Sequence, residues 1–169
     1  MVLSASELIG ALQHEVRVLS HLVSKVDATT LDYRPTPKQR SMIELLRYLS
    51  MMGPTLITFS LKKAEDDMNA IWGTAAKEAE GRNLEQVTAA IAAQGDEYAK
   101  LLGSLTDADF RAEIDGFAGK TSRGLFLVNL VLGGHAAYRT QLFCYLKSNG
   151  RDELVSSNLW SGMDPQPKA

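Results

Sequence analysis

Three histidines and one cysteine are the best candidates for metal binding or nucleophilic chemistry in this sequence of 169 residues. His14 and His21 are seven positions apart, so about 10.5 Å of helical rise separates them. Ligands of one zinc ion lie within about 2.1 Å of it, which favours spacings of three or four residues on a helix. We therefore interpret both as solvated surface histidines. Cys144 excludes an intrachain disulfide because it is the single cysteine, and we expect a buried, unreactive thiol.

His135 is the third histidine, and it lies about 60° from Tyr138 around the axis of a long predicted helix. A histidine at the edge of a core-facing surface is either a hydrogen-bonded structural residue or a ligand contact. Gly133 and Gly134 precede it, and each costs about 1 kcal/mol in a helix relative to alanine. They allow either close helix packing or a pocket. The inward face of this helix is expected to contain Leu127, Val131, Gly134, Tyr138, Leu142 and Tyr145.

Other motifs that carry chemistry are missing from the sequence. It has no glycine-rich phosphate loop, no nucleophile elbow, no zinc-protease motif and no Glu-x-x-His pair of the di-iron type. The acidic residues 65–67 have no glutamate at EF-hand spacing, and we interpret them as a solvated turn.

The charge balance excludes broad electrostatic binding to nucleic acid or to an anionic membrane. The chain has 18 Lys and Arg against 20 Asp and Glu, a net charge of −2, and no basic stripe. The N-terminal residues do not resemble a signal peptide, because Glu7 follows after six residues without a basic region. The longest apolar run, 124–137, is shorter than the ~20 residues of a transmembrane helix. We expect a cytoplasmic protein.

The apolar pattern predicts an all-α protein with a single domain over residues 1–169 and no convincing strand. Capping boxes open two helices, at Ser4 with Glu7 and at Ser41 with Glu44. Four amphipathic helices with longer connections favour a four-helix bundle. The expected helices cover residues 4–26, 41–63, 83–102 and 121–147.

The remaining segments connect or extend these helices. Gly53-Pro54 predicts a kink or a break inside the second helix. Residues 64–82 are interpreted as a crossover with a short helix around Trp72, and residues 103–119 as a second connection. The C-terminal segment 151–169 should dock through Leu154, Leu159 and Trp160, with the last two at least half buried and the final residues frayed.

Two helical motifs resemble those of the DinB/YfiT-like superfamily of four-helix bundles. Residues 41–48, Ser-Met-Ile-Glu-Leu-Leu-Arg-Tyr, follow the family pattern S-x-x-E-L-L-x-H up to its last position. Residues 134–142 match the family pattern H-x-x-x-H-R-G-Q-L at Arg139, Gln141 and Leu142, and residues 104–110 resemble the preceding loop. The resemblance implies an up-down-down-up topology with a long crossover between the second and third helices. Many family members bind a divalent metal through three histidines, and some are thiol-dependent transferases or isomerases.

The sequence departs from the family at all three metal-ligand positions. Tyr48, Gly134 and Tyr138 stand where the resemblance places histidines, and His135 lies one position, or about 100°, away from one of them. Two neutral phenols and a glycine do not form a credible zinc site. These departures predict a protein without a bound cofactor, and a divalent metal is the disfavoured alternative.

Three hypotheses for the function follow. The favoured one is a metal-free, homodimeric protein that binds a small molecule or a partner in the bundle pocket. The pocket candidates are Tyr48, Gly134, His135, Tyr138 and Gln141. One alternative is a thiol-dependent transferase or metal-dependent enzyme that uses His135, for example as a general base. Another is a structural or regulatory bundle without a ligand.

Overall fold

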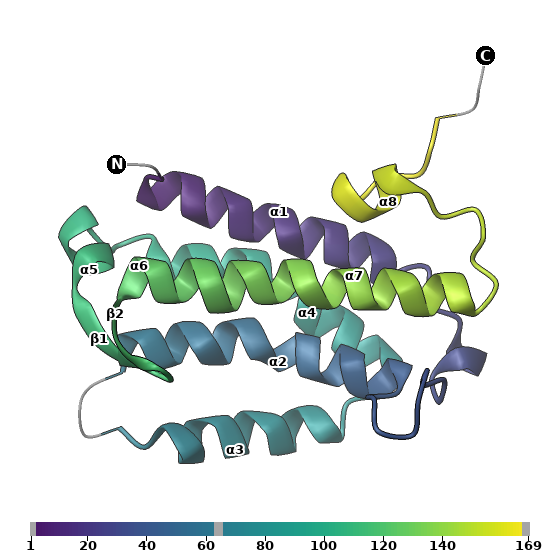
Figure 1. Cartoon of the computed structure of the whole chain (residues 1–169), viewed down its shortest axis with the longest axis horizontal. Coiled ribbons are helices and arrows are strands. Elements are labelled where there is room, and N and C mark those ends of the chain that lie inside the picture. Colours follow the sequence, from purple (N-terminus) through teal and green to yellow (C-terminus); the bar gives the residue numbers. More distant parts are fainter. Residues whose placement is uncertain (1–2, 63–65, 167–169) are drawn as a thin grey trace.

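Four long helices form the body of the protein in the computed structural model. The structure describes residues 3–62 and 66–166. The first and last helices run in one direction and the two between them run in the other (Figure 1), so the predicted up-down-down-up, all-α bundle is confirmed. The bundle helices are α1 (Ala5–Val23), α2 (Met42–Leu61), α4 (Leu84–Leu102) and a last helix built from α6 (Arg123–Phe126), the π-helical η2 (Leu127–Leu132) and α7 (Gly133–Ser148).

Helix ends follow the capping signals of the sequence. The Ser4 and Ser41 side chains accept hydrogen bonds from the backbone N–H groups of Glu7 and Glu44, and each glutamate accepts one from the cap residue in return. These reciprocal bonds satisfy N–H groups that lack a partner at a helix start. The predicted boundaries agree within a few residues, except at the last helix, where residues 121 and 122 belong to a strand. The predicted end at Lys63 and the frayed residues 167–169 lie outside the described residues.

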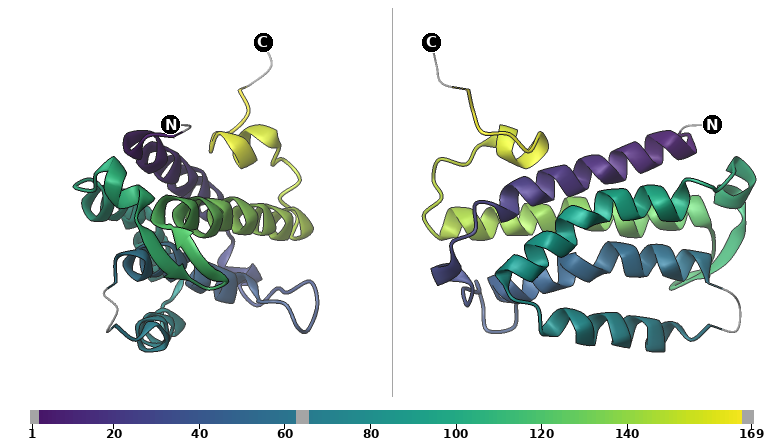
Figure 2. Two further views of the ribbon diagram at one scale, coloured as in Figure 1. Left: turned by 60° about the vertical axis from the view of Figure 1, so that its left-hand side comes forward. Right: turned by 180° about the vertical axis from the view of Figure 1, so that it is seen from behind.

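The crossover between α2 and α4 contains a full helix, α3 (Met68–Glu80), rather than a short one around Trp72. Asp67, part of the supposed solvated turn, caps this helix by accepting a hydrogen bond from the Asn69 N–H. The left view of Figure 2 shows α3 outside the bundle, and it packs along α2. The crossover is confirmed, and it adds an outer helix beside the bundle.

The connection between α4 and the last helix contains secondary structure that the sequence did not indicate. After the short α5 (Asp107–Arg111), strands β1 (Glu113–Gly116) and β2 (Gly119–Ser122) form an antiparallel hairpin in register. Each strand has four residues, too few for a clear alternation of apolar and polar side chains. Gly119 closes the turn with a φ of +109°, a conformation that glycine adopts without strain. The expectation of no strand is therefore wrong for this segment.

Helix α2 continues unbroken through Pro54, so a break at Gly53-Pro54, one of the two predicted outcomes, does not occur. Proline has no N–H and leaves the carbonyl of residue i−4, here Ser50, without its helical donor. The Arg82 guanidinium replaces that donor, with Nη1 lying 3.1 Å from the Ser50 carbonyl oxygen and 2.8 Å from its hydroxyl. A side chain from the connection between α3 and α4 thus completes the helical ladder at the proline.

The C-terminal segment docks on α1 through α8 (Ser156–Trp160). Leu154 and Asn158 are buried, and the Asn158 amide donates to Nε2 of His21 and to Asp164. Nε2 of His14 lies 3.0 Å from the Trp160 carbonyl oxygen. His14 and His21 therefore hold the tail, and the interpretation of both as solvated surface residues is wrong.

Two further expectations for side chains are wrong. Trp160 is 64% exposed, because its ring lies over the Arg139 guanidinium, 5.0 Å from ring centre to Cζ, instead of entering the core. Arg139 itself is buried and paired with Glu15, at 2.5 Å between Nε and Oε2. Cys144 is exposed rather than buried, because it lies on the outer side of α7.

The core consists of two clusters of buried apolar side chains, each with residues from all four bundle helices, and Tyr138 packs against both clusters. Fully buried examples are Leu12, Leu19, Leu45, Leu49, Ile91, Leu102, Val131 and Leu142. None of the helices in the described part of the chain combines the length and apolar character needed to cross a membrane.

Candidate ligand-binding site

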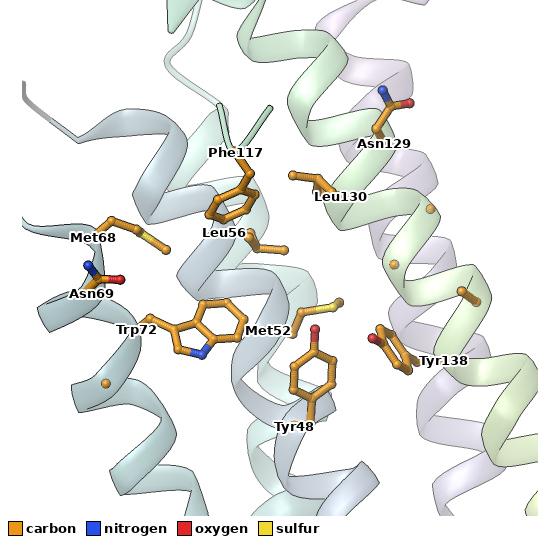
Figure 3. Close-up of a pocket in the computed structure, with 14 residues that line it drawn as sticks. Tyr48, Met52, Leu56, Met68, Asn69, Trp72, Phe117, Asn129, Leu130 and Tyr138 are labelled. Carbon is orange, nitrogen blue, oxygen red and sulfur yellow. The ribbon is translucent and has the colours of Figure 1, made fainter. Parts of the chain in front are cut away.

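A cavity of about 540 Å³ lies between α2, the outer helix α3 and the last helix, with the hairpin at one end (Figure 3). Its size is within the range of small-molecule sites in proteins. Most of the wall is apolar. The lining residues are Tyr48, Met52, Leu56, Met68, Asn69, Trp72, Gly73, Phe117, Asn129, Leu130, Gly133, Gly134, Ala137 and Tyr138.

Two tyrosines from different helices meet at one end of this cavity. The ring centres of Tyr48 on α2 and Tyr138 on α7 are 4.8 Å apart in an edge-to-face arrangement. The indole of Trp72 on α3 is 6.2 Å from Tyr48, centre to centre. Figure 3 shows that the hydroxyl ends of both tyrosines point to the space between α2 and α7. They give an otherwise apolar wall two hydrogen-bonding groups.

The open space of the cavity depends on Gly134, which has no side chain, and on the π-helical segment η2 before it. A Cβ at Gly134 would lie 3.1 Å from the Met52 sulfur, so any larger residue would enter the cavity or displace Met52. The π-helical η2 lies directly before this position. Its hydrogen bonds span five residues instead of four, which changes the phase of the side chains that follow. Gly134 and Tyr138 consequently line the cavity, whereas His135 lies in the core.

The chemical state of Tyr48 is set by burial and by its neighbours. Burial raises the pKa of the Tyr48 hydroxyl well above its usual range, and the adjacent Tyr138 hydroxyl raises it further. The Arg40 guanidinium lies over the Tyr48 ring, 4.1 Å from its centre, and opposes this effect more weakly. Tyr48 therefore stays a neutral phenol that can donate and accept hydrogen bonds.

His135 belongs to a buried hydrogen-bond chain on the other side of the helix. Its Nε2 lies 2.7 Å from the Tyr98 hydroxyl, which donates to Oε1 of Gln94, and the Gln94 amide donates to the Leu49 carbonyl. Since the hydroxyl proton goes to Gln94, the His135 ring donates from Nε2 and leaves Nδ1 unprotonated. That nitrogen is buried without a protein partner among the described residues. Burial lowers the pKa of His135 to about 4, so the ring is neutral at pH 7.

The cavity brings together three of the five pocket residues that the sequence suggested. Tyr48, Gly134 and Tyr138 line it, but His135 and Gln141 do not. The Gln141 amide donates to the Tyr145 hydroxyl, 2.7 Å away, which in turn donates to the Arg40 carbonyl. Gln141 therefore supports the loop before α2 rather than the cavity.

Sequence reasoning missed most of the remaining wall. Trp72 comes from a crossover helix that the pattern indicated only weakly, although a tryptophan there was a usable signal. Phe117 comes from the tip of the hairpin and stacks on Phe59, with ring centres 5.1 Å apart. Arg40 precedes the capping box of α2, and nothing in its sequence context marks it as a neighbour of Tyr48.

The residues that the motif resemblance places at a metal position do not fit a metal ion. No group of three or more His, Cys, Asp or Glu side chains in residues 3–62 and 66–166 has the proximity that metal binding needs. Tyr48 has a raised pKa and so holds its proton, whereas a metal ligand must give up a lone pair from a deprotonated group. Gly134 has no donor, and His135 is engaged with Tyr98.

Comparison with known proteins supports the architecture. No protein-family model matches the chain, and no curated protein matches it. Among solved structures, it is similar to the crystal structure of a DinB-like protein, YjoA, from Bacillus subtilis. The TM-score is 0.58 at 20% sequence identity, and the similarity covers 88% of this chain and 94% of the other. This chain therefore adopts the DinB-like fold, as the motifs in α2 and α7 predicted.

Proposed function

We propose that this protein binds a small organic molecule with an aromatic or aliphatic body in the cavity between α2, α3 and α7, without a metal ion. The observation that carries the proposal is the open, mainly apolar cavity with the paired hydroxyls of Tyr48 and Tyr138 at one end. Binding sites for small molecules combine such an apolar wall with a few polar groups that orient the ligand.

The ring of Trp72 and the two tyrosine rings offer flat surfaces to an aromatic ligand. Aromatic pairs with centres 4.5–7 Å apart are stabilised by roughly 0.5–1.5 kcal/mol beyond the burial of their area. The neutral tyrosine hydroxyls would orient the ligand through hydrogen bonds, because each can donate and accept.

Binding without chemistry is favoured over an enzyme that uses His135. A general base has to reach the proton that it removes, directly or through one water molecule. His135 does not line the cavity, and its Nε2 is engaged by Tyr98. No other histidine, cysteine, aspartate or glutamate lines the cavity either, within the described residues.

A fluorescent probe without charge, phenylnaphthylamine, tests the proposal. Gly73 lines the cavity on α3, and a Cβ there meets no atom within 4 Å, so Gly73→Leu fills open space. Gly10 on α1 is equally unobstructed and is remote from the cavity lining, which makes Gly10→Leu the matched control. We expect saturable binding at one site, weakened at least tenfold by Gly73→Leu and unchanged by Gly10→Leu. Equal binding by all three proteins, or no binding to the wild type, would refute the proposal.

A further inference from the structure

A second cavity, of about 550 Å³, adjoins the first and differs from it in charge. The two cavities share Tyr48, Trp72 and Gly73 in their walls, so these residues form the border between them, here called the passage. The first cavity is lined without any charged side chain, whereas five charged residues line the second. They are Arg40, Glu44, Arg47, Lys77 and Glu80.

The contacts of these side chains leave an excess of available positive charge. The Glu44 carboxylate is engaged, since it accepts from the Ser41 N–H at 2.7 Å and pairs with Arg34 at 3.3 Å. Lys77 forms no ion pair or side-chain hydrogen bond within the described part of the chain, and neither does Glu80. One of the two carboxylates is therefore already neutralised from outside the cavity.

Arg40 is a cation of the second cavity whose guanidinium contacts a residue of the passage. Its guanidinium lies 4.1 Å from the centre of the Tyr48 ring and 6.0 Å from that of Tyr138. Stacking over the rings holds the guanidinium in place through a cation–π interaction. Its N–H groups make no hydrogen bond or ion pair with another residue of segments 3–62 and 66–166. A guanidinium that is positioned but unpaired presents a planar fork of donors, which suits a carboxylate or a similar oxyanion.

We propose that the ligand is an amphipathic organic anion, with its apolar body in the first cavity and its acidic group at Arg40 in the passage to the second. This inference rests on the proposed function and adds the chemical class of the ligand. Tyr48, whose ring lies under the guanidinium, supports it with a neutral hydroxyl, because a phenol donates a hydrogen bond to an anion without opposing its charge. Lys77, on the opposite wall, supplies a second cation.

Two probes with the same aromatic skeleton separate the contribution of the anionic group to binding affinity from that of the apolar body. Anilinonaphthalene sulfonate is an anion, and phenylnaphthylamine is its counterpart without the sulfonate. The measurement is the ratio of their affinities for the wild type, for Arg40→Met and for Arg17→Met. Arg17 is exposed on α1 and lines neither cavity, so its variant controls for the loss of one positive charge. We expect the wild type to prefer the anion at least fivefold, Arg40→Met to lose this preference, and Arg17→Met to keep it.

The outcomes distinguish the two proposals. If the preference for the anion is absent, or if Arg40→Met retains it, the inference about the ligand class is wrong. Weakening of phenylnaphthylamine binding by Gly73→Leu would then still support the cavity as a binding site. If phenylnaphthylamine does not bind to the wild type at all, the proposed function fails, and the inference fails with it. Binding of the sulfonate that Gly73→Leu does not weaken would place the anion outside the passage and overturn the inference.

Discussion

The hydroxyl of Tyr98 on α4 lies 2.7 Å from Nε2 of His135 on α7, and both side chains are fully buried. This contact engages the one histidine of the last helix inside the bundle, whereas Gly134 and Tyr138 of the same helix line the cavity. Both groups are neutral, since burial raises the pKa of Tyr98 and lowers that of His135. The pair thus separates the core from the cavity that Tyr48 and Tyr138 line.

The low pKa of His135 makes folding depend on pH. Between pH 6.5, the usual pKa, and pH 4, its folded value of about 4, the unfolded chain binds a proton that the folded chain does not. The contribution of His135 to the free energy of unfolding should therefore be fully present above pH 6.5. The free energy of unfolding should fall by roughly 3 kcal/mol as the pH drops to 4. Denaturant unfolding of the wild type and of His135→Gln, which cannot titrate, measures this contribution as the difference between the two pH curves. Parallel curves would contradict it.

Gly53 provides the space for the Tyr98–His135 pair against α2. A Cβ at this position would lie 1.8 Å from the Tyr98 oxygen and 2.8 Å from Nε2 of His135. We expect Gly53→Ala to destabilise the protein by about 3 kcal/mol or more, with partial rescue by Tyr98→Phe. Gly95→Ala on α4 is the control, because its Cβ meets ordinary contacts at 3.9 Å. The control should raise stability by up to about 1 kcal/mol. Equal effects of the two substitutions in thermal unfolding would rule out this role for Gly53.

The Arg82 guanidinium should stabilise α2 more when residue 54 is a proline than when it is not. Arg82→Met leaves the Ser50 carbonyl without a donor and should cost roughly 1–3 kcal/mol. In a Pro54→Ala background, the new backbone N–H can bond to the same carbonyl, so Arg82→Met should cost less. A double-mutant cycle by denaturant unfolding measures the coupling between the two positions. An identical cost in both backgrounds would show that the proline and the arginine act independently.

We predict that the purified, untagged protein binds no metal ion. Elemental analysis measures its metal content per chain. The wild type should contain no stoichiometric zinc, nickel or iron. A triple variant with Tyr48→His, Gly134→His and Tyr138→His should bind about one metal ion per chain, because catalytic zinc sites generally use three protein ligands. The matched control carries glutamine at the same three positions. About one metal per wild-type chain would contradict the metal-free interpretation. A folded histidine variant without metal would instead show that these positions do not converge.

The sequence was sufficient for the bundle because short, local signals specify its helices. The reciprocal caps at Ser4 and Ser41 and the apolar spacing fix where helices start and which face is buried. Tyr48, Gly134 and Tyr138 were recognised through the motif resemblance, and the cavity indeed joins them. Homodimer formation and a cytoplasmic location stay predictions.

The wrong predictions concern features that the geometry of a regular helix, with 100° per residue, does not describe. The π-helical turn before Gly133 shifted His135 from the edge of the face into the core, where Tyr98, distant in sequence, is its partner. Trp160 stays exposed because a buried arginine offers its ring a surface contact that no local pattern encodes. The cavity wall formed by Trp72 and Phe117 depends on how a crossover helix and a hairpin tip pack, which is a long-range property.

A crystal structure of the protein with phenylnaphthylamine tests the central claim most directly. We expect the probe between the rings of Tyr48, Trp72 and Tyr138, with Gly134 open to it and no metal ion at that position. The same crystals without the probe should keep the space between α2, α3 and α7. A structure in which side chains fill this space and the probe lies elsewhere on the molecule would contradict the claim that the cavity is the binding site.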